Sequence, residues 1–232
     1  MNLGTNIQRV VFVSRPNRIT VIAVKNNRRI KCFLANPGRL SELLKVHTEL
    51  VINQIPISSK RKTLYDVVAV RHGELWISLD TRIPNKLVNY ALSEKRLKEF
   101  QTHTTITREV TFHRSRFDFL LESQMQSCLL EVKSCTLVRN HVAIFPDAPT
   151  TRGTKHLEDL ALAKRLGYRA CIMFVIQRAD ATSFRPNHKT DPDFCEALQK
   201  ARQTGVEVYA RRCRFNFDNF DLQLDVRIPV MT

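Results

Sequence analysis

The sequence lacks any apolar run that approaches the roughly 20 residues needed to cross a bilayer, and no basic segment followed by a long apolar one stands near Met1. We therefore expect a cytoplasmic protein with no membrane partner. The sequence has 6 cysteines but no C-x-x-C pair, and their spacing suggests no zinc knuckle. Reduced, buried thiols are the expected state of these cysteines.

Acidic residues are few relative to basic ones, with 22 Asp and Glu against 37 Lys and Arg, which gives a net charge of +15. Such an excess repels cationic partners and concentrates polyanions, so nucleic acid is the favoured partner. No basic amphipathic helix or lipidation motif supports a membrane surface instead. The alternative is that the charge serves only solubility. A hydrophobic fraction of 43% excludes an intrinsically disordered chain.

The first 83 residues show short apolar runs at regular spacing, which are typical of a small all-β domain. Asn26-Asn27 lies between two of these runs and favours a tight hairpin, because asparagine tolerates positive φ. A short helix is expected over residues 39–45. These features predict an OB-like small β-barrel that binds nucleic acid, with expected strands at 9–14, 19–24, 30–34, 50–55, 66–70 and 75–79.

Residues 84–232 read as a separate α/β domain, with the boundary near 81–85. Gly167 ends a helix expected over 151–166 and precedes the continuously apolar strand 170–176. Asp191-Pro192 begins another helix, which Gly205 ends before a further strand. Two such helix-glycine-strand units predict a mixed, partly parallel sheet flanked by helices. The other expected elements are a helix at 85–100 and strands at 107–112, 116–121, 128–137 and 222–228.

Charged side chains interrupt two apolar strands of this second domain. Asp118 lies in one, and Glu131 and Lys133 lie in the next, where alternation places both on one face. Two carboxylates suit a hard cation such as Mg²⁺, which polarises a phosphoryl oxygen and acidifies a water molecule. A neighbouring lysine stabilises negative charge. The pattern indicates metal-dependent phosphodiester hydrolysis, although a short D…ExK match also fits a surface salt bridge.

Longer strings in the sequence carry a family resemblance. They are Asn36-Pro37-Gly38-Arg39-Leu40, residues 115–121 (SRFDFLL), residues 130–137 (LEVKSCTL) and residues 145–157 (FPDAPTTRGTKHL). In this order, the chain resembles the sugar fermentation stimulation protein A family over essentially its whole length. The resemblance implies an N-terminal OB-like domain, a restriction-endonuclease-like PD-(D/E)XK domain and non-specific DNA binding. It implies nuclease activity only through the fold, and fold alone does not establish function.

Carried onto this sequence, the resemblance implies that Asp118 and Glu131 hold Mg²⁺ or Mn²⁺ and that Lys133 is catalytic. Glu109, or alternatively Glu94, would supply a further acid, unless these are only solvated glutamates. Further candidates are the phosphate contacts Lys155 and His156 at the start of a helix, where anions bind readily, and the flanking Arg114, Arg116 and Arg152. His156 could equally cap the helix or pack at the core edge.

Outside this site, a basic loop formed by Lys60, Arg61 and Lys62 is expected to contact nucleic acid. Tyr65 and Trp76 could stack on bases, although core packing is the more common use of Trp76. The leading prediction is a DNA-binding protein with a metal-dependent nuclease site. The alternatives are a catalytically silent DNA-binding regulator linked to sugar metabolism, and an RNA-binding or RNA-processing protein. A homodimer is left open.

Overall fold

The computed structural model describes residues 6–56, 63–216 and 221–231. The chain divides into two compact units. The first comprises Met1–Ile83 together with Gln177–Ala179 and Cys213–Gln223, and the second comprises the remaining residues. The sequence prediction placed all of 84–232 in one domain, whereas the structure groups these two later segments with the first unit.

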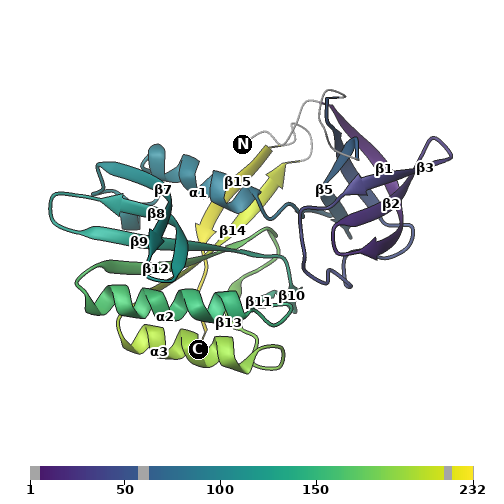
Figure 1. Ribbon diagram of the computed structural model, residues 1–232. Coiled ribbons are helices and arrows are strands. Elements are labelled where there is room, and N and C mark those ends of the chain that lie inside the picture. The colour runs from purple at the N-terminus through teal and green to yellow at the C-terminus, as the bar shows by residue number, and fades with distance from the viewer. Residues whose placement is uncertain (1–5, 57–62, 217–220, 232) are drawn as a thin grey trace. The chain divides into compact units, whose positions relative to one another are not determined.

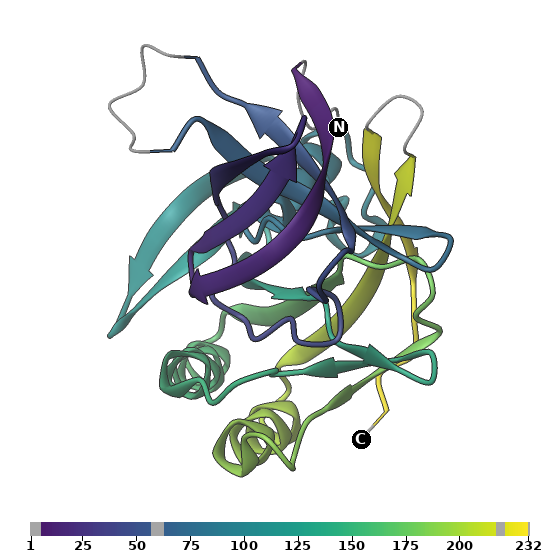
Figure 2. The same cartoon turned by 90° about the vertical axis from the view of Figure 1, so that its right-hand side faces the viewer.

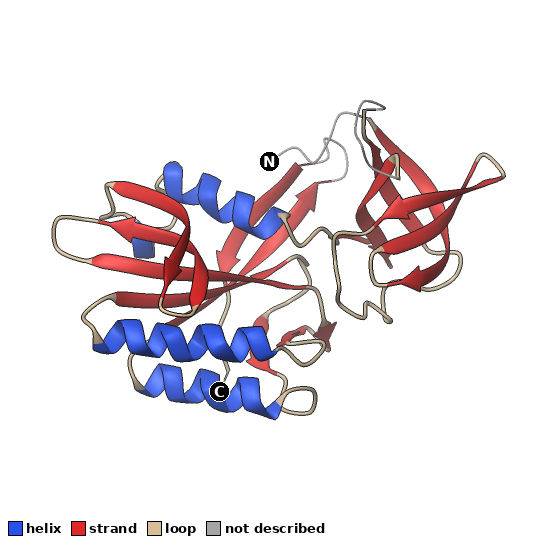
Figure 3. Cartoon of the chain, in the orientation of Figure 1, coloured by secondary structure: helices blue, strands red, loops and turns tan. Residues whose placement is uncertain are grey.

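The first unit is built around a small β-barrel, as predicted (Figures 1 and 3). Its strands follow the order β3-β2-β1-β4-β5-β6, and a further pairing of β3 with β5 closes the sheet on itself. Asn26 and Asn27 adopt φ values of 48° and 60° and join β2 to β3, which confirms the expected hairpin. The strands are β1 (Ile7–Asn17), β2 (Thr20–Lys25), β3 (Arg28–Phe33), β4 (Glu49–Gln54), β5 (Tyr65–His72) and β6 (Leu75–Ser78).

The helix expected over residues 39–45 is wrong. Leu40 has a left-handed φ of 52°, which an α-helix does not allow. The carbonyl of Leu40 accepts from the N–H groups of Leu43 and Leu44, so only a single turn forms. Leu40 and Leu43 are both buried in the barrel core. Burial of these two side chains outweighs the local preference of the sequence for a regular helix.

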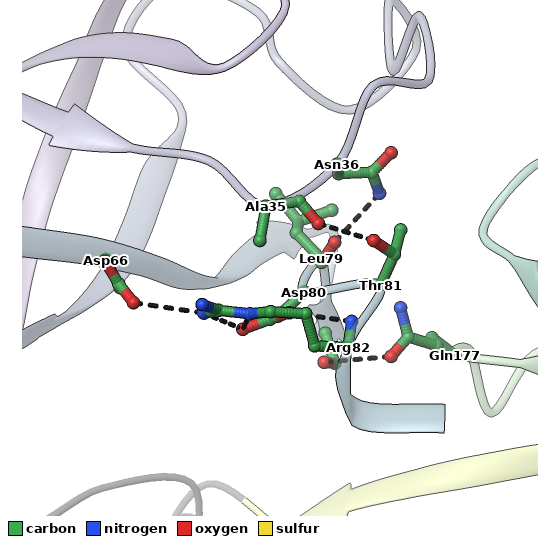
Figure 4. Close-up of polar contacts among 9 residues, drawn as sticks. Ala35, Asn36, Asp66, Leu79, Asp80, Thr81, Arg82 and Gln177 are labelled. Carbon is green, nitrogen blue, oxygen red and sulfur yellow. Dashed lines mark hydrogen bonds and ion pairs between the residues drawn. The ribbon is translucent and has the colours of Figure 1, made fainter. Parts of the chain in front are cut away.

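A polar cluster, which we call the arginine clamp, fixes the chain where it leaves the last strand of the barrel (Figure 4). It consists of Arg82, Asp80 and Asp66. The Arg82 guanidinium donates to both carboxylate oxygens of Asp80, and its Nη2 also lies 3.0 Å from Asp66 Oδ2. Asn36 donates to the carbonyl of Leu79 at 2.8 Å in the same region. These bonds hold the segment that leads into the first helix.

A mixed sheet with the strand order β15-β14-β12-β9-β8-β7 lies mostly in the second unit, with the end of β14 and the start of β15 counted in the first. Parallel pairing joins β9 to β12 and β12 to β14, and antiparallel pairing joins β7 to β8 and β8 to β9. This arrangement confirms the predicted mixed sheet. The strands are β7 (Thr105–Phe112), β8 (Ser115–Glu122), β9 (Ser127–Cys135), β12 (Arg169–Ile176), β14 (Glu207–Asn216) and β15 (Asp221–Arg227).

Helices cover the mixed sheet. Figure 1 shows α2 (Thr151–Arg165) and α3 (Pro192–Gln203) on one face and α1 (Ile83–Ser93) on the other. Figure 2 looks nearly along α2 and α3 and shows them side by side. Thr150 and Asp191 each accept a backbone N–H from three residues further on, which caps the two helices. Gly167 and Gly205 follow the helix ends with φ values of 92° and 98°, as predicted.

Two features of the second unit differ from the sequence prediction. The helix expected over 85–100 stops at Ser93, because Lys95 takes a φ of 51°, and a short 3-10 turn follows at Lys98–Phe100. A separate small sheet of β10 (Val138–Arg139), β11 (Val142–Phe145) and β13 (Ser183–Pro186) was not predicted. Within the described ranges, every helix is too short or too polar to cross a membrane.

Candidate active site

Asp118 lies where strands β8 and β9 separate. Their ladder runs from Glu122 opposite Ser127 to Phe119 opposite Leu130. One residue beyond it, Asp118 Oδ2 accepts the backbone N–H of Val132 at 2.7 Å, and Oδ1 accepts Nδ2–H of Asn85 at 2.5 Å. The Asp118 carboxylate therefore accepts a backbone N–H of β9 at the point where a backbone carbonyl would accept it if the β8–β9 ladder continued. This places it beside the strand segment that carries Glu131.

Glu131 is 3% exposed, and its two carboxylate oxygens have different surroundings. Oε1 lies 2.5 Å from Lys133 Nζ and 2.5 Å from His156 Nδ1. Oε2 is buried and has no hydrogen-bond partner in the part of the chain that the structure describes. A buried oxygen without a partner is costly, so Oε2 is the position where a ligand would be most favourable.

The surroundings of Asp118 and Glu131 shift the pKa values of the two carboxyls in opposite directions. Burial, followed by the charge of Glu131, raises the pKa of Asp118 to about 7, although the Val132 N–H, Lys133 and Asn85 act against this shift. Burial also favours the neutral form of Glu131. However, the charge of Lys133 and the hydrogen bond from His156 outweigh it and lower the pKa of Glu131. One carboxyl is thus held ionised, while its neighbour titrates near neutrality.

Helix α2 contributes His156 and Arg152 to the same cluster. His156 is 3% exposed, and Arg152 Nε donates to His156 Nε2 at 3.3 Å. Lys155 is half-buried and precedes His156 by one residue on the same helix. The structure therefore brings together Asp118, Glu131, Lys133 and His156. Their convergence agrees with the spacing argument, while their catalytic roles remain predictions.

The predicted basic flank is engaged in ion pairs. Arg114 pairs with Glu158 and Asp159 on α2, at 3.2 and 3.6 Å. Arg116 Nε lies 2.9 Å from Glu109 Oε2. Glu109 has a φ of 59° and a side chain that is 47% exposed, so the structure places it with Arg116 at the surface rather than in contact with the clustered acids.

The other predicted residues are Glu94 in the second unit and several residues of the first. Glu94 is exposed beyond the end of α1, so it is not part of the clustered site. Lys60, Arg61 and Lys62 lie outside the described residues. Trp76 is half-buried against Val51 and Ala69, in agreement with packing as its more common use.

Cation–π contacts accompany both aromatic candidates of the barrel. Arg9 lies 5.9 Å from the Trp76 ring centre, and Lys25 lies 5.1 Å from that of Tyr65. Both rings are half-buried, so each keeps some exposed surface next to a cation.

Asn85 is the site residue that sequence reasoning missed. It lies on α1, 33 residues from the Asp118 carboxylate to which it donates. Its only sequence signal was its place at the predicted domain boundary, and no periodicity links a helix start to a distant strand.

Among the described residues, no group of three or more His, Cys, Asp or Glu side chains could hold a metal ion. A cation here would take its carboxylate ligands from Asp118 and Glu131 and fill its other positions with oxygens of water, substrate or backbone.

Comparison with known families gives two matches that together cover most of the chain. Residues 82–219 match the Sugar fermentation stimulation protein RE domain. Residues 13–79 match the SfsA N-terminal OB domain. The chain belongs to the sugar fermentation stimulation protein family.

Relatives in this family are similar to the chain along nearly its full length. A sugar fermentation stimulation protein homolog from Moorella thermoacetica is 44% identical, and the match covers 93% of this chain and 94% of the relative. A homolog from Clostridium perfringens is 38% identical over 98% and 99% of the two chains. The solved structure of Pyrococcus furiosus SfsA in complex with Ca²⁺ has a TM-score of 0.92 and 25% identity, covering 100% and 98%.

Proposed function

We propose that this protein binds nucleic acid and hydrolyses phosphodiester bonds with the help of a divalent cation. The observation that carries the proposal is the buried Oε2 of Glu131, which has no partner among the described residues, on a strand whose next residue, Val132, donates its backbone N–H to Asp118. The matching RE domain and the relative solved with Ca²⁺ support this proposal. The net charge of +15 supplies the general attraction for a phosphate backbone.

Asp118 and Glu131 fit a hard cation because both offer oxygen ligands, which Mg²⁺ and Mn²⁺ prefer. No donor from the described residues reaches Glu131 Oε2, and each Asp118 oxygen accepts a hydrogen bond and keeps further acceptor capacity. Such a cation would supply Lewis-acid polarisation of the phosphoryl oxygen and acidification of the attacking water. Asn85 and the Val132 N–H hold the Asp118 side chain in place for this role.

The remaining side chains act directly on the substrate. Lys133 holds Glu131 with one N–H and keeps further donors for a phosphate oxygen or the attacking water. Its positive charge stabilises the negative charge that develops in the transition state. Arg152 lies in the first turn of α2, where the backbone N–H groups also favour an anion, and Lys155 begins the next turn. These two residues would position the phosphate without reading the base sequence.

Binding without turnover is the second candidate function. The net charge of +15 supports binding to a phosphate backbone whether or not a cation is held. On this account the protein is a DNA-binding regulator, and a cation between the acids and the backbone would only relieve repulsion. RNA is the third substrate class, because phosphate contacts do not distinguish it from DNA.

A cleavage assay separates these candidates. The full chain is incubated with labelled single- and double-stranded DNA and RNA, with Mg²⁺ or Mn²⁺ and then with EDTA. Glu131→Ala and Lys133→Ala are tested in parallel. Glu196→Gln is the control, because this exposed carboxylate on α3 pairs with Lys200 one turn further along the same helix.

The proposal expects cleavage that requires the metal, that is lost in both site variants and that persists in the control. If no substrate is cut while the variants bind DNA as tightly as the wild type or more tightly, binding without turnover replaces the proposed hydrolysis. Cleavage confined to RNA would retain the mechanism and change the substrate class.

A further inference from the structure

We propose that His156 is a positioning residue that presents Glu131 Oε2 to the cation, and that it does not contact the scissile phosphate. This inference rests on the proposed function of the site. It assigns His156 a different task from the phosphate contact expected from the sequence. The argument comes from the partners of its two ring nitrogens.

The partners of His156 define which nitrogen carries the proton. Arg152 has only N–H donors, so His156 Nε2, 3.3 Å from Arg152 Nε, must present its lone pair. The ring proton then lies on Nδ1, which donates to Glu131 Oε1 at 2.5 Å. A ring protonated on both nitrogens would set an N–H against the Arg152 N–H. The 3.4 Å approach of Lys133 Nζ to Nδ1 brings two donors together, so it is a contact and not a hydrogen bond.

This arrangement divides the two oxygens of Glu131 between different tasks. Oε1 accepts from both Lys133 and His156, which uses its two lone pairs. Oε2 is buried and receives no donor from the described residues. His156 therefore fixes the rotation of the carboxylate, so that the oxygen without donors is the one left for a cation. Without the imidazole, Lys133 alone would leave the carboxylate free to turn about its terminal torsion.

The ring itself is held rigidly. His156 is 3% exposed and packs against Phe117, with ring centres 5.6 Å apart and planes at 59°. It lies on α2, whose first turn is capped by Thr150 through the Gly153 N–H. With Nδ1 directed to Glu131 and Nε2 facing Arg152, neither nitrogen has a proton free to donate to a phosphate. A rigid, fully engaged imidazole is suited to orienting a ligand rather than to transferring protons.

Two amide substitutions of similar size test this geometry. His156→Asn keeps an N–H close to the position of Nδ1, whereas His156→Gln places its amide closer to the position of Nε2. Binding of Ca²⁺ to the full-length protein is measured by calorimetry for each variant. We expect His156→Asn to stay within about threefold of the wild type and His156→Gln to lose roughly 10- to 100-fold in affinity. Thermal unfolding with EDTA present checks that both variants fold.

Nitrogen-15 NMR of the histidine ring shows which ring nitrogen carries the proton, and this result does not depend on a change in stability. We expect the wild type without metal to show a protonated Nδ1 and an unprotonated Nε2 at His156. A proton on Nε2, or equal Ca²⁺ affinity in the folded Gln variant and the wild type, would overturn the positioning role while leaving the hydrolase proposal in place. Failure of the wild type to bind Ca²⁺ and to cleave would instead overturn the proposed function, together with the metal-directed task of His156.

Discussion

Each unit contains two carboxylates grouped with basic side chains, but the hydrogen-bonding arrangements differ. In the arginine clamp, Arg82 donates to both oxygens of Asp80 and to Asp66 (Figure 4). In the second unit, Lys133 and His156 donate to the same oxygen of Glu131, and Oε2 has no partner among the described residues. The difference lies in which oxygens are satisfied, not in the number of charges.

This difference teaches that a cluster of charges is not by itself evidence for a site. The planar guanidinium of Arg82 matches two carboxylates in fixed geometry, so the clamp closes on itself and stabilises a chain segment. The compact ammonium of Lys133 donates to one oxygen of Glu131 and leaves the other oxygen without a donor among the described residues. We expect the first arrangement to contribute to stability and the second to chemistry.

The largest expected effect separates the two arrangements by activity. Glu131→Gln should reduce metal-dependent cleavage on the order of 10³-fold, equivalent to about 4 kcal/mol, because it removes a metal ligand. Asp80→Asn in the arginine clamp is the matched substitution, and it should leave cleavage within about threefold of the wild type. Single-turnover cleavage rates measure both effects. Similar losses of cleavage rate in the two variants would show that the two clusters do not differ in their importance for catalysis.

The pH dependence of stability is the second expected effect. The pKa of Asp118 is about 7 in the folded protein, raised by burial and by the charge of Glu131 from about 3.9 in the unfolded chain. Its contribution to stability is therefore fully present below pH 4 and is lost as pH rises toward 7. Without metal, the free energy of unfolding should fall by about 4 kcal/mol more in the wild type than in Asp118→Asn across this window.

Urea unfolding in EDTA at pH 4, 5, 6 and 7 measures this difference. Other groups titrate over the same range, so the comparison uses the wild type minus Asp118→Asn at each pH. A difference that stays constant from pH 4 to 7 would show that the Asp118 carboxyl does not titrate near neutrality.

The third effect concerns the arginine clamp itself. Arg82→Met should lower the free energy of unfolding by about 2 kcal/mol, because it leaves the buried carboxylates of Asp66 and Asp80 without their guanidinium partner. The Arg82 side chain is 48% exposed, which keeps the loss below that of a fully buried pair. Chemical unfolding measures the change, and the Ca²⁺ affinity of the folded variant should remain that of the wild type.

The smallest effect concerns the exposed Glu109–Arg116 pair. Glu109→Gln should strengthen binding to duplex DNA about two- to threefold and steepen its salt dependence by about 0.9, because it releases one arginine for a phosphate contact. Fluorescence anisotropy at several salt concentrations measures both quantities. Weaker binding by this variant would indicate that Glu109 orients Arg116 toward DNA instead of competing for it.

Much of the fold could be predicted because local signals and tertiary packing agree there. The Asn26-Asn27 hairpin, the Asp191 cap and Gly167 each form what their residue types favour. The predicted helix over 39–45 failed because burial of Leu40 and Leu43 overrides local propensity. The return of residues 213–223 to the first unit could not be predicted, since nothing in strand periodicity identifies the unit that a strand joins.

The candidate site was predictable only in part. Strand alternation brought Asp118, Glu131 and Lys133 into consideration, because charges inside apolar strands are unusual. A sequence pattern does not encode tertiary distances. Three features depend on such distances: the contact of Asn85 with Asp118, the two hydrogen bonds to Glu131 Oε1, and the orientation of His156. For the same reason, the sequence could not reveal that Arg114 and Arg116 pair with acids.

The central claim is that Asp118 and Glu131 together hold one divalent cation. Calorimetric titration of the full-length protein with Ca²⁺ tests it most directly, with Glu131→Gln, Asp118→Asn and the Glu196→Gln control measured under the same conditions. The account predicts saturable binding of one ion that is lost in both site variants and retained in the control. Binding of equal affinity in Glu131→Gln and the wild type would contradict it.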